Sequence, residues 1–238
     1  MRDRLKYYLY RLERDWIDMK KITWNRGELW KGCMLASIAH AINVAHYPEF
    51  AHEQSWDGFN YNVQDSSGTR GTITFHSNYL VAAFRDDNNE RVSDYKDALE
   101  YFKDAPEELK ELATDETLQY LLEDINGEAV PMITAAFWGT GEEIYSQEEF
   151  DEMIENGGFL LERQAMDIET AIDEWQEDAE MSDVQINLLK SIFHRKVENP
   201  SKVIVLTAEE IQMIESEDEE GLAESRISFE EIGIEWEV

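Results

Sequence analysis

The segment from Gly58 to Arg85 constrains the fold most, because its side chains alternate in character along two consecutive stretches. In residues 59–64 and 72–76, apolar side chains are separated by asparagine, glutamine or threonine, which is the period of a strand with one buried face. The turn sequence Asp-Ser-Ser-Gly lies between the two stretches. The continuous apolar run of residues 79–84 is typical of a strand covered on both faces. The segment therefore predicts a three-stranded antiparallel meander.

The same segment is nearly free of acidic residues, although the chain has 53 Asp and Glu against 21 Lys and Arg. It holds one acid, Asp65, and two bases, Arg70 and Arg85. Burying carboxylates in inner strands is costly, and this cost is the simpler explanation. The alternative is a recognition face beside Trp56, Tyr61 and Arg70. Its members are the polar side chains expected to face solvent, which are Asn60, Asn62, Gln64, Thr72, Thr74 and His76.

The rest of the chain mixes helical and strand patterns. Apolar spacings of three and four residues predict helices over residues 3–21, 28–45, 93–102, 104–125 and 167–181. A further helix, which carries Leu188, Leu189, Ile192 and Phe193, is predicted after Ser182. Helix starts with capping-box spacing are expected at Ser146–Glu149, Ser182–Gln185 and Thr207–Glu210. Strands are predicted over residues 129–138, 159–164, 202–206 and 226–238. Residues 215–221 read as a solvated acidic loop.

No regular strand–helix–strand rhythm runs through the chain, so the pattern favours an α+β fold with a mostly antiparallel sheet and helices packed on it. The length of 238 residues allows a single compact domain or two intimately packed halves. We expect an N-terminal α+β part over residues 1–140, with two helices, the meander, further helices and a strand. An acidic C-terminal α+β part over residues 141–238 would pack against it.

The formal net charge of −32 is unevenly distributed. It is +4 over residues 1–31, −13 over residues 32–141 and −23 over residues 142–238. The mildly basic N-terminal helix is expected to pack on an acidic face of its own protein, or alternatively to contact an acidic surface of a partner. Because a strongly negative field repels phosphates, direct binding to nucleic acid or to anionic membranes is not expected.

The single cysteine, Cys33, has no second cysteine with which to form an internal disulfide. The first 16 residues carry charges every two or three positions and so lack the apolar region of a signal peptide. The longest weakly polar run, residues 33–45, is too short to span a bilayer. These features predict a reduced, soluble protein of the cytoplasm.

Catalytic motifs are weak. His40, His46 and His52 are six residues apart, so on a helix they would point to different faces, and no HExxH pattern occurs. One of them could still pair with Glu49 or Glu53 for acid–base chemistry.

Other sites are equally poorly supported. Cys33 lies in an apolar helical run, where a buried structural thiol is usual. No phosphate-binding glycine loop occurs, and Gly139–Gly141 is followed by two glutamates. Asp151 and Glu162 faintly resemble a nuclease pattern, but Gln164 takes the place of the lysine. No cofactor is expected.

These observations favour a binding protein over an enzyme. The first hypothesis is an acidic inhibitor, immunity protein or antitoxin that docks by charge mimicry on a basic, nucleic-acid-facing surface of a toxin nuclease or another DNA- or RNA-acting protein. Its expected partner-binding residues are Glu215, Glu217, Asp218, Glu219, Glu220, Trp56, Tyr61 and Arg70. The alternative is a metal-dependent hydrolase or nuclease with clustered carboxylates and one of the histidines, including His76. A third reading is a subunit whose acidity only maintains solubility.

Overall fold

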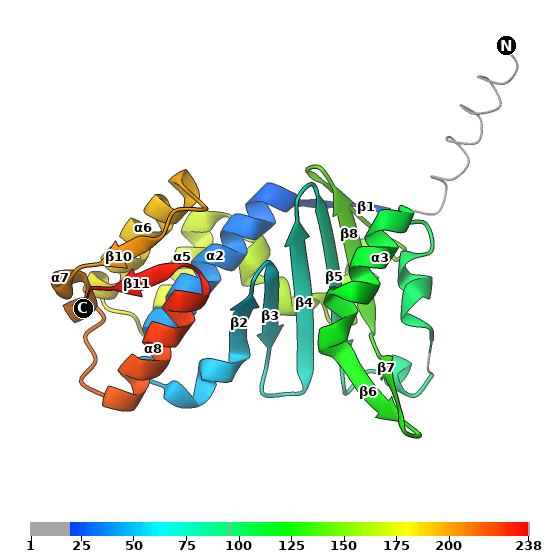
Figure 1. The fold of residues 1–238 in the computed structure, drawn as a ribbon, viewed down its shortest axis with the longest axis horizontal. Coiled ribbons are helices and arrows are strands. Elements are labelled where there is room, and N and C mark those ends of the chain that lie inside the picture. Colours follow the sequence, from blue (N-terminus) through cyan, green and yellow to red (C-terminus); the bar gives the residue numbers. More distant parts are fainter. Residues whose placement is uncertain (1–19, 95, 238) are drawn as a thin grey trace, which may run out of the picture. The chain divides into compact units, whose positions relative to one another are not determined.

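The computed structural model describes residues 20–94 and 96–237 (Figure 1). The described chain forms two compact units: residues 20–26 and 68–159 make unit 1, and residues 27–67 and 160–237 make unit 2. Each unit is therefore built from separate segments, and the boundary expected at residue 140 falls within unit 1. The predicted helix over residues 3–21 lies outside the described residues, except for Lys20 and Lys21, which begin a strand.

Unit 1 contains a sheet in which every pair of neighbouring strands is antiparallel, in the order β1-β9-β8-β5-β4. Its strands are β1 (Lys20–Asn25), β4 (Thr69–His76), β5 (Tyr79–Asp86), β8 (Ala135–Thr140) and β9 (Glu143–Ser146). Strand β5 is buried at Leu80–Arg85, so the prediction of a strand covered on both faces is confirmed. A separate hairpin, β6 (Leu122–Ile125) and β7 (Glu128–Pro131), turns at Asn126 and Gly127, which both have positive φ.

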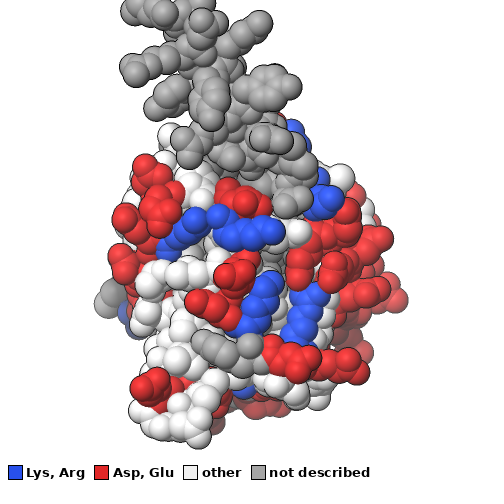
Figure 2. All heavy atoms as spheres, turned by 90° about the vertical axis from the view of Figure 1, so that its right-hand side faces the viewer, with Lys and Arg blue, Asp and Glu red and all other residues white. Residues whose placement is uncertain are grey.

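Short helices cover the sheet of unit 1. They are η2 (Glu90–Val92), η3 (Ala98–Phe102), α3 (Glu107–Asp115), η4 (Thr117–Leu121) and α4 (Phe150–Glu155). Helix α3 begins directly after Pro106, with two glutamates in its first turn, and lies within the helix predicted over residues 104–125. Phe102 and Leu109 from these helices pack with Val81 and Trp138 from the strands in one buried cluster. On the side of unit 1 that carries α3, basic side chains lie among more numerous acidic ones (Figure 2).

Unit 2 is mostly helical. Its helices are α2 (Arg26–Asn43), η1 (Pro48–Glu53), η5 (Gly158–Leu161), η6 (Arg163–Ala165), α5 (Ile168–Asp178), α6 (Asp183–Glu198), α7 (Ala208–Gln212) and α8 (Glu219–Glu231). Its strands are the antiparallel pair β2 (Gln54–Asp57) and β3 (Asn60–Gln64) and the parallel pair β10 (Ile204–Leu206) and β11 (Ile234–Trp236). Twelve of the 18 residues of α2 are buried, so this helix has close neighbours, as its small side chains predict.

The α+β class with mostly antiparallel strands is confirmed. The capping boxes at Ser182 and Thr207 are also confirmed. In each, the hydroxyl accepts a hydrogen bond from the backbone N–H of the third helical residue, and the side chain of that third residue accepts one from the backbone N–H of the serine or threonine. The box expected at Ser146–Glu149 is wrong. Ser146 ends β9, where its hydroxyl donates to the Ala136 carbonyl, and Glu149 is the residue that precedes α4.

Three segment predictions are wrong. Residues 159–164 form 3-10 turns, because their short apolar run supplies one buried leucine, Leu161, rather than an alternating face. Residues 122–125 leave the predicted helix and pair as β6. The acidic residues before Gly221, which were predicted to form a loop, include the start of α8. This helix continues through residue 231, so β11 is the only strand within the predicted strand region of residues 226–238.

Candidate functional site

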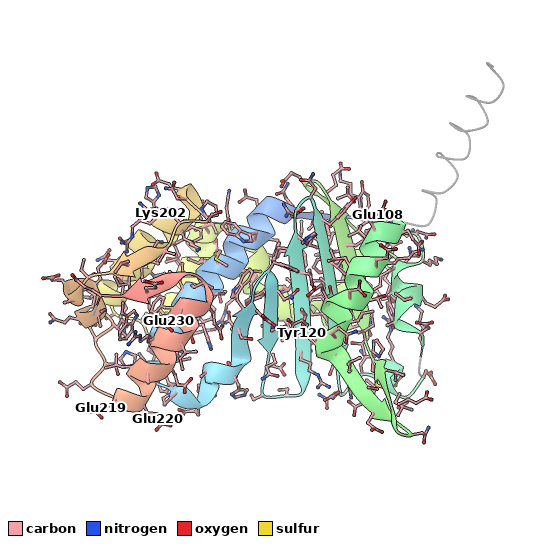
Figure 3. The ribbon with its side chains drawn as sticks, in the orientation of Figure 1. Glu108, Tyr120, Lys202, Glu219, Glu220 and Glu230 are labelled. Carbon is pink, nitrogen blue, oxygen red and sulfur yellow. The ribbon has the colours of Figure 1, made fainter. Side chains whose placement is uncertain are left out.

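The five acidic residues predicted to bind a partner lie together on the surface of unit 2, where the chain enters α8. Glu215, Glu217, Asp218, Glu219 and Glu220 are all exposed. Glu219 and Glu220 project outward from the first turn of α8 (Figure 3). Some of these acids also have a local role, because Asp218 accepts a hydrogen bond from the Glu220 N–H and caps the helix. The acidic run is therefore both a helix start and an accessible negative surface.

Trp56 and Tyr61, two other predicted binding residues, are buried in unit 2. Trp56 is 9% exposed and its indole donates to the Ser37 hydroxyl at 2.7 Å. Tyr61 is fully buried, and its hydroxyl donates to Gln54 and accepts from Gln164. Their rings pack against each other with centroids 5.3 Å apart. Both residues are therefore core residues in this structure.

Arg70 belongs to unit 1 and lies in a network of charges rather than alone. Its guanidinium pairs with Asp87 at 3.1 Å and with Glu123 at 3.7 Å, and Arg85 pairs with the same two carboxylates. The side chain of Arg85 is only 9% exposed. The two arginines on adjacent strands are thus held by acids of their own unit.

The polar row predicted to face solvent is only partly exposed: Asn62 and Gln64 are half-buried, and His76 is exposed. Thr72 and Thr74 are at most 1% exposed and Asn60 is 3% exposed. For Thr74 the prediction is wrong because η4 lies on β4: the Thr74 and Thr117 hydroxyls are hydrogen-bonded at 2.7 Å. The period-two pattern correctly predicts a strand at β4, but η4 covers the face of β4 that was expected to contact solvent.

Residues of α2, η1, η6 and α5 in unit 2 line a cavity of about 440 Å³, here called the α5 pocket. Four charged side chains line it: Glu53, Arg163, Asp178 and Glu180. Arg163 forms an ion pair with Asp178, and its guanidinium lies 4.8 Å from the ring centroid of Trp175. Because Trp175 and Asp178 are three residues apart on α5, both reach the same side of that helix.

Aromatic side chains form another part of the α5 pocket wall. Tyr47 and Phe50, which lie at the start of η1, have ring centroids 6.4 Å apart and are 42% and 38% exposed. Burial raises the pKa of Glu53, and the nearby His52 opposes that shift. Glu180, just beyond α5, has a positive φ of 49°, a conformation that few residues with a side chain adopt. The pocket thus combines aromatic rings with carboxylates.

His40 lines the same pocket from α2 and is only 3% exposed. Burial lowers its pKa to about 4, against the effect of a hydrogen bond with the Ala51 carbonyl, and His52 lowers it further. The imidazole is therefore neutral near pH 7.

His40 should make stability dependent on pH. Its ordinary pKa is near 6.5, so between pH 6.5 and 4 the unfolded chain binds the proton more readily than the folded one, and stability falls as the pH falls. The full loss is roughly 3 kcal/mol. Urea unfolding of the wild type and of His40→Gln at pH 7 and pH 4.5 should show a steeper loss for the wild type. Parallel pH profiles for the two proteins would contradict the assignment.

The other predicted catalytic residues have structural surroundings. Nε2 of His46 lies 2.9 Å from both the Ile214 carbonyl oxygen and the Gln185 amide nitrogen. Cys33 is fully buried, and burial raises the pKa of its thiol well above the ordinary value. Glu162 lies in the turn before η6 rather than in the strand predicted over residues 159–164. Among residues 20–94 and 96–237, no group of three or more His, Cys, Asp or Glu side chains is arranged to hold a metal ion.

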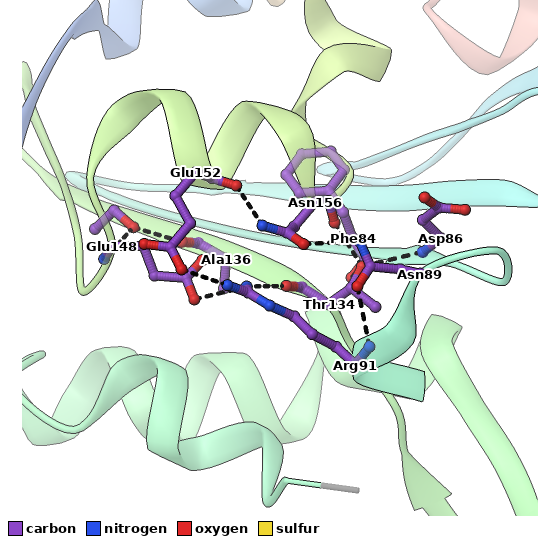
Figure 4. A network of polar contacts seen from close by, with 10 residues as sticks. Phe84, Asp86, Asn89, Arg91, Thr134, Ala136, Glu148, Glu152 and Asn156 are labelled. Carbon is purple, nitrogen blue, oxygen red and sulfur yellow. Dashed lines mark hydrogen bonds and ion pairs between the residues drawn. The ribbon is translucent and has the colours of Figure 1, made fainter. Parts of the chain in front are cut away.

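A network of polar contacts in unit 1 surrounds Arg91 (Figure 4). Its guanidinium donates to Glu148, Glu152 and the Thr134 carbonyl at 2.6–2.7 Å. Asn89 accepts from the Arg91 backbone N–H and donates to Asn156. These contacts connect η2 with Thr134, which directly precedes β8, and with α4, so the network holds these parts of the unit together.

Sequence reasoning missed most of the α5 pocket. Arg163 lies in the segment 159–164 that was predicted to be a strand, and Tyr47 and Phe50 follow the predicted helix of residues 28–45 without a motif that marks them. The spacing of Trp175 and Asp178 was the one signal in the sequence that could have placed an aromatic ring and a carboxylate side by side.

Within the described ranges, no helix has both the length and the apolar character needed to cross a membrane. Comparison with models of known protein families, with curated protein sequences and with solved structures found no match.

Proposed function

We propose that this chain is a binding protein that docks on a basic surface of a protein partner, as an inhibitor, immunity protein or antitoxin does. The observation that supports the proposal is the charge of unit 2, where 27 acidic residues stand against seven lysines and arginines. Seven cations cannot neutralise 27 carboxylates, so the unit carries a large excess of negative charge at neutral pH. Unit 1 is less extreme, with 22 acidic and nine basic residues in its described part.

A basic partner is the class that this charge fits. A field of one sign speeds the approach of a protein of the opposite sign and repels nucleic acid. The surface of a DNA- or RNA-acting protein, such as a toxin nuclease, is built to receive phosphates. Exposed carboxylates at Glu217, Glu219 and Glu220 offer such a surface a similar density of negative charge. Occupation of that surface would block access of the nucleic acid.

Binding through these acids should depend strongly on salt. Charges at a protein surface are screened within about 8 Å at physiological ionic strength, so the association rate should fall tenfold or more between low and high salt. The immobilised protein should capture a basic protein from a lysate of its own source at low salt and release it at high salt. The association rate of that purified protein is then measured as salt is raised.

The acidic run at α8 can be tested with a charge-matched control. A variant with Glu217→Gln, Asp218→Asn, Glu219→Gln and Glu220→Gln keeps an acceptor at the helix cap and should associate at least several-fold more slowly. The control removes four exposed acids from α3, through Glu107→Gln, Glu108→Gln, Glu111→Gln and Asp115→Asn. Equal slowing in both variants would show that only total charge matters. Capture that is indifferent to salt would contradict the proposal.

The metal-dependent hydrolase gains no specific support from the described residues, which bring no set of metal ligands together. We therefore put forward a single function.

A further inference from the structure

The α5 pocket joins two kinds of group that together suit a cation. The faces of aromatic rings are negative and attract ammonium and guanidinium groups. Tyr47 and Phe50 present two such rings at an accessible part of the wall. Glu53 and Glu180 add carboxylates on the same lining. Carboxylates alone would keep the protein soluble. The exposed pair of aromatic side chains beside them indicates a contact site.

Unit 2 itself shows that this wall accepts a guanidinium. Arg163 lies over Trp175 at 4.8 Å and pairs with Asp178, which is the stacked and charge-paired arrangement that a planar guanidinium favours. The side chain of Arg163 is 31% exposed, so it covers one wall of the 440 Å³ cavity. The remaining lining keeps two rings and two carboxylates for a second cation.

The charge of the lining selects against an anion. Arg163 is balanced by Asp178, while Glu53 and Glu180 are in excess. His40 adds no positive charge at neutral pH. The net charge of the lining is therefore negative, and a carboxylate or phosphate ligand would be repelled.

We propose that the α5 pocket is a recognition site for a guanidinium group, supplied by an arginine side chain of the protein partner. The identity of the source rests on the proposed function, because a basic partner presents arginines. The pocket would give such a partner a point of specific contact, whereas the acids at the start of α8 supply general attraction. Bidentate pairing and stacking distinguish arginine from lysine at a site of this kind.

The test is a titration of the full-length chain with acetyl-arginine amide, followed by NMR. Addition of the amide should shift the indole N–H resonance of Trp175 in a saturable way, whereas acetyl-glutamate amide should leave that resonance in place. Acetyl-lysine amide should bind more weakly than the arginine compound. Glu53→Gln and Glu180→Gln should each weaken binding of acetyl-arginine amide about three- to tenfold, the range of a partly exposed charge contact.

Glu177→Gln is the matched control, because this exposed α5 residue does not line the pocket and its substitution changes the net charge equally. It should alter the affinity less than twofold. The absence of saturable shifts, equal binding of acetyl-glutamate amide, or an equal effect of Glu177→Gln would each overturn the site. Tighter binding of propylguanidinium than of acetyl-arginine amide would assign the pocket to a small organic cation and overturn the partner as the source.

The two proposals fail in different ways. Loss of the arginine signal together with salt-sensitive capture of a basic protein would overturn the pocket alone. Saturable arginine binding without a salt-sensitive partner would overturn the proposed function and leave the guanidinium site standing.

Discussion

Gly32→Ala is expected to destabilise the protein by about 3 kcal/mol or more, against the preference of helices for alanine. Gly32 lies within α2, and a Cβ atom there would be 1.8 Å from the carbonyl oxygen of Gln164 and 2.6 Å from its carbonyl carbon. These are backbone atoms, so the neighbour cannot rotate away. Helix α2 and the η6 turn would have to separate, which would expose buried apolar surface. Urea unfolding monitored by circular dichroism measures the loss.

The sign of the change in unfolding free energy tests the close approach of α2 and η6 directly. In an exposed helix interior the same substitution would stabilise by about 1 kcal/mol, so a stabilised Gly32→Ala protein would show that α2 and η6 do not approach closely. The control is Gly58→Asn in the β2–β3 turn. Gly58 has a φ of 62°, which asparagine tolerates, and no atom lies within 4 Å of its added Cβ. Its cost should stay below about 1 kcal/mol. If Gly32→Ala aggregates on expression, the soluble fraction relative to Gly58→Asn supplies the comparison.

Local signals in the sequence predicted the elements whose determinants are local. The capping boxes at Ser182 and Thr207 need only residues within one turn, and both form as expected. Helix α3 likewise follows from Pro106 and the acids behind it. Helix α8 begins in a similar way, because Asp218 caps it and two glutamates lie in its first turn. In so acidic a chain, this local pattern could not be distinguished from the many other runs of acidic residues.

The candidate site depends on contacts between residues far apart in the chain, which no local pattern reveals. The pocket residues come from α2, η1, η6 and α5, and the pairing of Arg163 with Asp178 requires that η6 fold as a turn. Burial of Thr74 similarly depends on Thr117, 43 residues away. Charge composition identified residues 142–238 as strongly acidic, but it did not predict which carboxylates would lie beside aromatic rings.

Arg91→Met is expected to cost about 2–3 kcal/mol, because it removes one partner of a largely buried ion pair. The Glu148 side chain is only 12% exposed, and burial raises its pKa while the Arg91 guanidinium opposes that shift. Without Arg91 the buried carboxylate would lose the main charge that opposes its burial, and its pKa would rise further. In the variant, protonation of Glu148 at low pH removes the cost of burying its charge. The destabilisation should therefore grow as the pH rises from 5 to 8.

A double-variant cycle separates this effect from lost packing. Glu148→Gln removes the buried charge, so Arg91→Met should cost at least about 1 kcal/mol less in that background, and the pH dependence of the difference should disappear. Arg226→Met is the control, since Arg226 and Glu230 form an exposed i,i+4 pair with side chains 52% and 47% exposed, and its loss should cost about 0.5 kcal/mol or less. Equal costs for Arg91→Met and Arg226→Met would show that Glu148 is solvated in the folded protein, and the Arg91 network would then contribute no more than a surface ion pair.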